Sequence, residues 1–152
     1  MPPVTMRDAT RADLPDLVRM LADDPLGASR EGSAEPLDPA YEAAFAAIAA
    51  APGERLLVAE REGRAIGMLQ LSLIPGLSRR GMTRAQIEGV RVAAEHRGAG
   101  IGEALVRHAI AIARAAGCGL VQLTTDKSRT DAHRFYARLG FVASHEGMKL
   151  GL

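Results

Sequence analysis

Three glycines fall within five residues, at a point where a strand is expected to give way to a helix. The first turn of a helix leaves backbone amides unpaired, and with the positive end of the helix dipole these amides bind anions. Glycines carry no β-carbon that would hold a pyrophosphate away from them. The run predicts a phosphate-binding turn, with an ordinary tight turn of small residues as the alternative. Its residues are Arg97, Gly98, Ala99, Gly100, Ile101 and Gly102.

The spacing of these glycines separates the known kinds of nucleotide-binding turn. A P-loop requires Gly-Lys followed by Ser or Thr, which this run lacks. The dinucleotide fingerprint G-x-G-x-x-G requires a third glycine, and neither Glu103 nor Leu105 supplies it. A dinucleotide-binding domain is therefore kept only as an alternative.

The elements that must position this turn follow from hydrophobic periodicity. The expected helices are Thr10–Ala22, which opens with an acidic capping box of Thr10 and Asp13, then Pro39–Ala50, a helix from Ile101 that ends at Gly117, and Asp131–Leu139. The expected strands are Val4–Asp8, Leu56–Ala59, Ala65–Ile74, Thr83–Val92, Leu120–Thr125, Phe141–Ser144 and Met148–Leu150. This order predicts a single mixed α/β domain over residues 1–152.

The composition is that of one globular domain, with 47% hydrophobic and 24% charged residues among 152. Lys and Arg number 19 against 18 Asp and Glu, and this balance disfavours a nucleic-acid partner, which usually requires a basic face. No signal peptide and no stretch long enough to cross a membrane is recognisable. The single cysteine, Cys118, is typical of a reducing compartment. We therefore expect a cytoplasmic protein without nucleic-acid or membrane partners.

The glycine turn is one of three motifs with a consistent order and spacing. Arg97, Gly100 and Gly102 fit a signature of Arg or Gln, two residues, Gly, one residue, and Gly or Ala. The strand Ile87–Val92 precedes it and the segment Ala132–Phe141 follows it. Together the motifs resemble the GNAT (Gcn5-related N-acetyltransferase) superfamily. The resemblance implies a mixed, mostly antiparallel sheet of about six or seven strands, splayed in the middle and flanked by about four helices.

The resemblance also implies that acetyl-coenzyme A is the co-substrate and lies in the gap of the splayed sheet. Its pyrophosphate would meet the amides from Gly98 to Gly102. Its pantetheine arm would pair with the backbone near Val90 and Val92, as a peptide pairs with an open strand edge. Many members have Asn where this chain has Arg129, so the contact there is expected to differ, and an arginine suits a phosphate.

The resemblance assigns Tyr136 as the general acid that protonates the sulfur of coenzyme A. The alternative is a core aromatic, because Phe135, Tyr136 and Phe141 are three of only five aromatic residues. The implied reaction is direct transfer of an acetyl group to an amine within a ternary complex. The sequence does not identify that amine.

Glu88 is the candidate general base, acting through a water. It lies in the middle of a predicted strand, where an ionisable side chain is disfavoured unless it faces water or a partner. Burial there would suit a general base. The alternative is a solvent-facing glutamate that pairs with Arg91, Arg84 or another of the many arginines.

The remaining candidates are less specific. The histidines lack metal-ligand spacing, so no metal is expected, and Cys118 has the pattern of a small packed residue rather than an acyl-accepting thiol. Arg79 and Arg80, with Arg84 and Arg91, favour a carboxylate or phosphate on the acceptor if they face the cleft. A homodimer is compatible with the resemblance. A non-catalytic acyl-coenzyme A sensor is the rival function, because it keeps the glycine turn without needing catalytic side chains.

Overall fold

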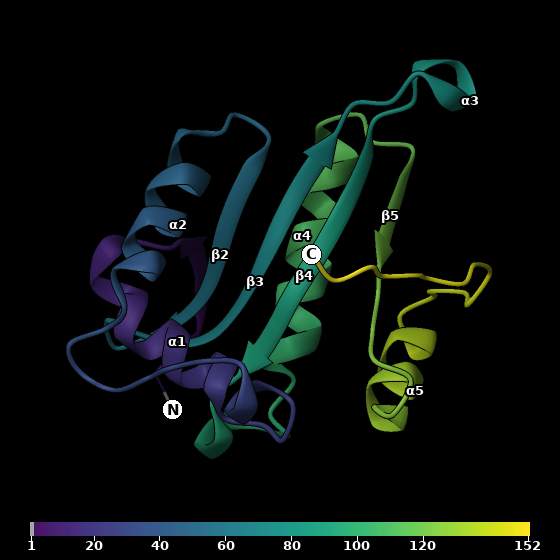
Figure 1. The fold of residues 1–152 in the computed structure, drawn as a ribbon. Helices are drawn as coiled ribbons and strands as arrows, with labels where there is room; N and C mark the ends of the chain where they lie inside the picture. The colour runs from purple at the N-terminus through teal and green to yellow at the C-terminus, as the bar shows by residue number, and fades with distance from the viewer. Residues whose placement is uncertain (1) are drawn as a thin grey trace.

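A sheet of five strands in the order β1-β2-β3-β4-β5 organises the computed structural model, which describes residues 2–152. The strands are β1 Thr5–Asp8, β2 Glu54–Arg61, β3 Arg64–Ile74, β4 Arg84–Val92 and β5 Leu120–Leu123. Neighbouring strands from β1 to β4 pair antiparallel, whereas β5 runs parallel to β4 (Figure 1). The expected mixed, mostly antiparallel sheet is confirmed, but it has fewer strands than the six or seven predicted.

Helices cover both faces of the sheet (Figure 1). The longer ones are α1 Leu14–Ala22, α2 Pro39–Ala50, α4 Ile101–Ala115 and α5 Thr130–Arg138; the short ones are η1 Arg11–Asp13, η2 Gly27–Ser29, α3 Ser78–Gly81 and η3 Ala94–His96. Leu105 of α4 shares one core cluster with Leu69 and Ile87 of the sheet. Leu17 of α1 shares a second cluster with Val58 on the opposite face. The two faces therefore have separate cores.

The two C-terminal strands expected from the sequence, Phe141–Ser144 and Met148–Leu150, do not form. The chain after α5 is extended but irregular, and it passes in front of the sheet (Figure 1). The side chains of Met148 and Leu150 are 94% and 86% exposed. Alternating apolar residues predict an extended backbone, but a strand also needs hydrogen bonds to a neighbouring edge. Within residues 2–152 this segment pairs with no strand.

The sheet opens between β4 and β5. Their pairing is limited to Arg84–Ile87 of β4 and Leu120–Leu123 of β5. Beyond it the chain leaves β5 for α5, so the two segments diverge (Figure 1). The edge of β4 from Glu88 to Val92 consequently has a partner only on its β3 side among the residues described. The predicted splay of the sheet is confirmed.

A β-bulge shapes this open half of β4. Between Glu88 and Arg91, two residues of β4 lie opposite one residue of β3, and Gly89 has a φ of +64°. The extra residue shifts the alternation of side chains by one position. Val90 and Val92 pack against the core under α4, which leaves Glu88 and Arg91 on the opposite face. The bulge therefore brings a carboxylate and a guanidinium to the same side of the strand.

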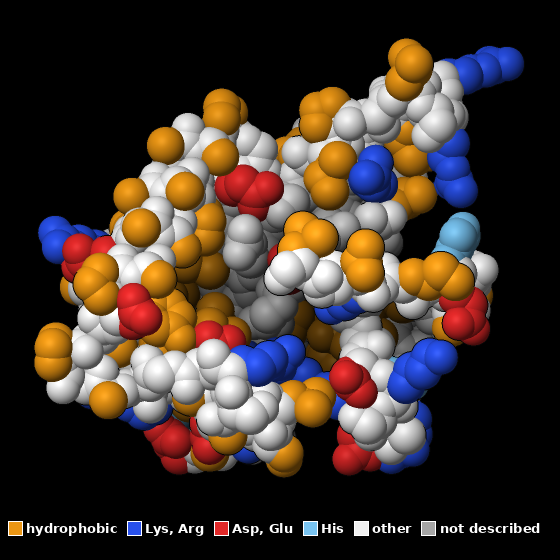
Figure 2. All heavy atoms as spheres, in the orientation of Figure 1, with side chains coloured by type: hydrophobic (Ala, Val, Ile, Leu, Met, Phe, Trp, Pro, Cys, Tyr) orange, Lys and Arg blue, Asp and Glu red, His pale blue; other side chains and the backbone are white. Residues whose placement is uncertain are grey.

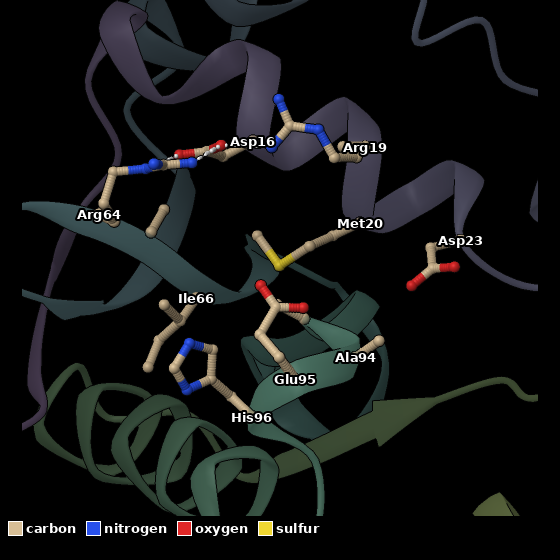
Figure 3. Close-up of a pocket in the computed structure, with 11 residues that line it drawn as sticks. Asp16, Arg19, Met20, Asp23, Arg64, Ile66, Ala94, Glu95 and His96 are labelled. Carbon is tan, nitrogen blue, oxygen red and sulfur yellow. Dashed lines mark hydrogen bonds and ion pairs between the residues drawn. The ribbon is translucent and has the colours of Figure 1, made fainter.

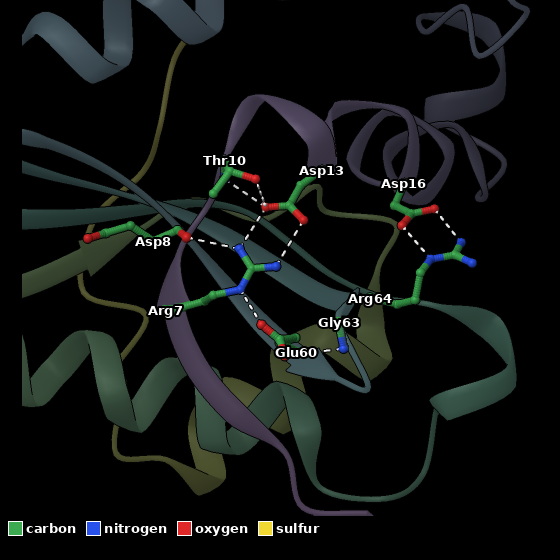
Figure 4. A network of polar contacts seen from close by, with 8 residues as sticks. All are labelled: Arg7, Asp8, Thr10, Asp13, Asp16, Glu60, Gly63 and Arg64. Atoms are coloured by element: carbon green, nitrogen blue, oxygen red, sulfur yellow. Dashed lines mark hydrogen bonds and ion pairs between the residues drawn. The ribbon is translucent and has the colours of Figure 1, made fainter.

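A polar network joins the start of α1 to the edge of the sheet (Figure 4). Arg7 donates to the two carboxylate oxygens of Asp13 at 2.7 and 3.0 Å, and it also bonds Glu60. The backbone N–H of Thr10 donates to Asp13 at 2.7 Å, as expected of the acidic cap. The side chain of Asp13 is buried, and its bonds with Arg7 hold the pKa of this carboxyl below the ordinary value. The network fixes where α1 begins.

Replacing Asp13 by Asn is expected to lower the free energy of unfolding by about 2 to 3 kcal/mol at neutral pH, because Arg7 loses its charged partner. The lowered pKa of Asp13 means that this stabilisation is present above the ordinary value of 3.8 and disappears as the pH falls through the folded-state value. Urea unfolding at neutral pH and at about pH 2.5 measures both limits. An Asp131→Asn variant at an exposed ion pair is the control. A stability difference that persists unchanged in acid contradicts the assignment.

Candidate active site

The glycine turn has the conformation that its sequence predicts. Gly98 and Gly100 have φ angles of +81° and +79°, in the left-handed region that other residues avoid. Gly100 caps α4, and the amides of Gly98, Ala99 and Gly100 donate to no acceptor among residues 2–152. Unpaired amides therefore gather at the N-terminus of a 15-residue helix, which is the arrangement that binds a phosphate.

A cavity of about 360 Å³ lies beside these amides. Its walls come from the end of β4, the glycine turn, the first turn of α4, and α5. The residues that line it are Val92, His96, Arg97, Gly98, Gly100, Ile101, Gly102, Glu103, Phe135 and Arg138. A methyl group on Gly102 would lie 3.6 Å from Val92 and 3.7 Å from Phe135, so the turn packs closely on both neighbours. The strand motif, the glycine turn and the segment Ala132–Phe141 thus each contribute residues to the lining of this cavity.

Arg97 connects the glycine turn to its surroundings. Its guanidinium donates to the carbonyl oxygen of Val92 at 3.2 Å and to that of Asp23 at 3.3 Å. It also reaches the carboxylate of Asp23 at 3.4 Å. Arg97 therefore links the turn to the end of β4 and to the loop after α1. A direct contact of Arg97 with a cofactor stays a prediction.

Tyr136 projects from α5 into the core cluster under α4. Its ring centroid is 5.0 Å from that of Phe135 and 5.8 Å from that of Phe141. Burial raises the pKa of its hydroxyl, and the charges of Arg129 and Arg91 oppose part of that increase. The hydroxyl makes no hydrogen bond with residues 2–152. Aromatic packing of the ring and proton donation by the hydroxyl are compatible, because they use different atoms.

Glu88 lies on the open half of β4 and is exposed, as the alternative of a solvent-facing glutamate expects. Its carboxylate accepts a hydrogen bond from the side-chain amide of Gln86, two residues along the same strand. Its carboxylate forms no ion pair with an arginine in the structure of residues 2–152, and Arg91 pairs with Asp24 instead. Figure 2 shows that the sheet is hollowed between α2 and the C-terminal segment, on the face opposite α4. Glu88 as a general base stays a prediction.

Of the four arginines that the sequence places near the acceptor side, Arg79, Arg80, Arg84 and Arg91, only Arg91 lies on the open half of β4. Arg79 and Arg80 lie in α3, at the opposite end of β4 from the glycine turn (Figure 1). Arg91 instead lies on the open half of β4, with its guanidinium 3.0 Å from the carboxylate of Asp24. Sequence reasoning missed Asp24, because this residue lies in a polar loop that is distant from Arg91 in the sequence and belongs to no motif. A role for Arg79 and Arg80 at the cleft is therefore wrong.

A second cavity of about 190 Å³ lies between α1 and η3 (Figure 3). None of the predicted catalytic residues lines it. Its carboxylate Asp16 is already bonded by Arg64 at 2.7 and 2.9 Å and by Arg19 at 2.7 Å. These ion pairs hold α1 on the sheet and engage Asp16 without a ligand.

The described residues offer no other obvious chemistry. Residues 2–152 contain no group of three or more His, Cys, Asp or Glu side chains placed to hold a metal. Cys118 is half-buried, unpaired, and packed against the core under α4. No helix in the described part of the chain has the length and apolar character needed to span a membrane.

The chain is similar in sequence to known proteins. The model of the acetyltransferase (GNAT) family matches residues 15–141. Glucosamine 6-phosphate N-acetyltransferase of Trypanosoma brucei brucei is 37% identical over 90 residues, which cover 59% of this chain and 59% of that protein. Aminoalkylphosphonate N-acetyltransferase of Salmonella typhimurium is 36% identical over 106 residues, which cover 70% of this chain and 68% of that protein.

A solved structure resembles the whole chain. The crystal structure of a transcriptional regulator from Bacillus halodurans C-125 has a TM-score of 0.96 and 49% identity, and the match covers 99% of this chain and 100% of that chain. The match to the family model spans well over half of the chain and includes the glycine turn, the open half of β4 and all of α5. The chain belongs to the acetyltransferase (GNAT) family.

Proposed function

We propose that this protein is an acetyl-coenzyme A dependent N-acetyltransferase that transfers the acetyl group directly to an amine in a ternary complex. One observation carries the proposal: the unpaired edge of β4 leads to a helix-capping glycine turn with free amides, with Tyr136 on the adjacent α5. Membership of the family supports it, as do two relatives whose names specify N-acetyl transfer to amine compounds.

The residues present fit acetyl-coenzyme A. The amides from Gly98 to Gly102 suit the pyrophosphate, because they are unpaired and line a cavity at the start of α4. The open edge of β4 at Val90 and Val92 suits the amide groups of the pantetheine arm. Arg129, which precedes α5, is a further candidate contact.

The bound co-substrate supplies the acetyl group, so that a C–N bond to the amine forms as the C–S bond of the thioester breaks. Glu88 accepts the proton that the amine loses, through a water, because its carboxylate faces solvent on the open strand. Tyr136 donates its hydroxyl proton to the departing sulfur, and its raised pKa keeps that proton in place at neutral pH.

Calorimetric titration with acetyl-coenzyme A, with NAD as the comparison ligand, tests the cofactor assignment. We expect a saturable site for acetyl-coenzyme A alone. Gly100→Val should weaken it at least about tenfold, because a β-branched residue cannot keep the left-handed turn that presents the amides. Gly117→Val, at a similar φ of +82° beyond the other end of α4, is the matched control. Binding of NAD instead, or equal effects of the two variants, contradicts the assignment.

A non-catalytic acyl-coenzyme A sensor is the second candidate. It is favoured by the description of the Bacillus halodurans structure as a transcriptional regulator. Such a protein binds acetyl-coenzyme A in the same titration but acetylates no amine. Measurement of thiol release with a panel of primary amines separates the two functions, since only the enzyme releases coenzyme A in proportion to the acceptor.

We also infer a cytoplasmic location and a homodimer. The single cysteine, Cys118, supports a reducing compartment. The exposed apolar side chains of Val142, Met148 and Leu150 support association with a second copy. Light scattering at several protein concentrations tests the dimer, and a constant monomer mass contradicts it.

A further inference from the structure

All the side-chain carboxamides of the protein lie on one face of the sheet. The chain has three glutamines and no asparagine. Gln70 lies in β3, Gln86 in β4 and Gln122 in β5, three strands that are neighbours in the sheet. The residues before and after each glutamine pack in the core under α4, so the glutamines face the opposite side. They therefore share the face that carries Glu88, where the sheet is hollowed (Figure 2).

Two of the three glutamines form a chain of hydrogen bonds that ends on Glu88. The amide nitrogen of Gln122 donates to the amide oxygen of Gln86 at 2.9 Å. The amide nitrogen of Gln86 in turn donates to the carboxylate oxygen Oε1 of Glu88. Because Gln86 accepts at its oxygen and donates from its nitrogen, the two bonds specify one orientation of its amide. Oε2 of Glu88 accepts no hydrogen bond from residues 2–152 and remains open to water.

The pairing of β4 with β5 explains why this chain of bonds forms. Gln86 and Gln122 lie directly opposite each other in the parallel pairing, which ends one residue later. Glu88 is two residues beyond Gln86, so it is the first residue of this face on the open half of β4. Both glutamines are half-buried, whereas Glu88 is exposed. The bonds therefore tie an exposed carboxylate at the open edge to amides held in the paired part of the sheet.

Gln70 is engaged elsewhere. It lies opposite Glu88 in the pairing of β3 with β4, yet its amide nitrogen donates to Glu54 of β2 at 3.0 Å. The hydroxyl of Ser72 donates to the same carboxylate oxygen of Glu54 at 2.7 Å. Gln70 thus has the residue type, the face and the half-buried environment of the other two glutamines, but not their connection to Glu88. It is the matched control for them.

We propose that Gln86 and Gln122 are positioning residues for Glu88, the candidate general base. This inference rests on the proposed function, because it concerns the proton-accepting step of the same reaction. An exposed glutamate side chain samples several rotamers, and its carboxylate several positions. The bond from Gln86 holds Oε1 and presents Oε2 to the water that relays the proton, while Gln122 keeps the nitrogen of Gln86 directed at Glu88. A base acts within hydrogen-bond reach of its proton, so its placement affects the rate.

A purely structural role is the competing explanation, since cross-strand amide pairs also stabilise a sheet. In that case loss of either glutamine lowers the free energy of unfolding, and any loss of activity is the same with or without the carboxylate of Glu88. A positioning role requires instead that the effect on kcat depend on that carboxylate. A double-mutant cycle therefore separates the two roles.

Side-chain NMR tests the chain of bonds without an acceptor. The nitrogen-15-labelled protein gives three pairs of side-chain NH2 signals, because it has three glutamines and no asparagine, and each Gln→Met variant identifies one pair. We expect Gln122→Met to lower the order parameter of the Gln86 amide from the rigid range near about 0.85 toward the flexible range below about 0.6. The order parameter of Gln70 should not change. A Gln86 amide that stays equally ordered, or equal changes at Gln86 and Gln70, overturns the inference.

The double-mutant cycle is measured on kcat, by thiol release at saturating acetyl-coenzyme A. The acceptors offered are 2-aminoethanol, 2-aminoethyl phosphate, 3-aminopropionate and glucosamine, and the fastest of them is used. We expect Gln86→Met to lower kcat about 10-fold or more and Gln122→Met about 2- to 10-fold, since the bond to a charged group is the stronger. The KM for acetyl-coenzyme A should not change. In the Glu88→Gln background both effects should shrink to less than about twofold, and Gln70→Met should have none in either background.

The outcomes separate this inference from the function on which it rests. Equal effects of Gln86→Met in both backgrounds, or an increase in KM with kcat unchanged, overturn the positioning role and leave the base in place. A loss of less than tenfold in Glu88→Gln alone removes the base, and the positioning role with it. Failure to bind acetyl-coenzyme A refutes the proposed function whatever the NMR result.

Discussion

Tyr136→Phe is expected to lower kcat about 100- to 10,000-fold, the usual contribution of a general acid, while the affinity for acetyl-coenzyme A changes little. The substitution removes only the hydroxyl, so the ring keeps its packing against Phe135 and Phe141. Steady-state thiol release with a saturating amine measures kcat, and calorimetry measures cofactor affinity. Because burial raises the pKa of Tyr136 above the ordinary 10.0, the wild-type kcat should not decline through loss of this proton until the pH exceeds that value.

The chain offers a matched control for this prediction, since it has only two tyrosines. Tyr41 lies in α2, where its hydroxyl donates to Glu31 at 2.8 Å and accepts from the N–H of Gly32. Tyr41→Phe removes an equivalent hydroxyl outside the proposed machinery and should leave kcat unchanged. A Tyr136→Phe enzyme with kcat within about threefold of the wild type rules out the acid role, because a general acid contributes far more than that.

Glu88→Gln is expected to lower kcat by about 100-fold or more, because glutamine keeps the shape of the side chain but accepts no proton from the amine. The KM for acetyl-coenzyme A should not change, since Glu88 is assigned to the acceptor and not to the cofactor. Glu88→Asp should recover part of the activity by restoring a carboxylate. Stopped-flow measurement of a single turnover separates this chemical step from product release.

The exposure of Glu88 makes this prediction a sharp one. A glutamate that serves only as a surface partner of Gln86 predicts a loss of less than tenfold, below the range of a general base. Glu62→Gln, at the exposed turn between β2 and β3, is the control for loss of a surface charge. Comparable losses in Glu88→Gln and Glu62→Gln would falsify the assignment of the base.

The sequence predicted well those parts of the fold that local chemistry determines. The left-handed glycines at 98 and 100, the cap at Thr10 and Asp13, and the apolar stripe of α4 each depend on residues close together in the chain. The C-terminal strands were predicted wrongly from the same kind of pattern, because strand formation depends on a distant partner. Alternation at Met148 and Leu150 specifies an extended chain but not the edge to which it bonds.

The candidate site also combines features that depend on neighbouring residues with features that depend on distant segments. The glycine turn and the candidate Tyr136 could be singled out because they lie within motifs, whereas the ion pair of Arg91 with Asp24 depends on two segments, distant in the sequence, that meet in space. Adjacency in the sequence favoured Arg79 and Arg80, but these lie at the wrong end of β4. The bulge at Gly89 was equally hidden, because a single glycine in a strand does not reveal the extra residue that places Arg91 on the same face of β4 as Glu88.

The open half of β4 has a consequence for solubility. From Glu88 to Val92 one row of backbone N–H and C=O groups lacks a strand partner in the described structure. An unpaired edge of this kind is a template on which other molecules add strands and aggregate. A ligand that lies along the edge blocks this addition, and at a hundredfold excess over its dissociation constant it also stabilises the folded chain by about 2.7 kcal/mol. If acetyl-coenzyme A lies along this edge as proposed, it acts as a protective strand, and aggregation during purification should diminish when coenzyme A is present.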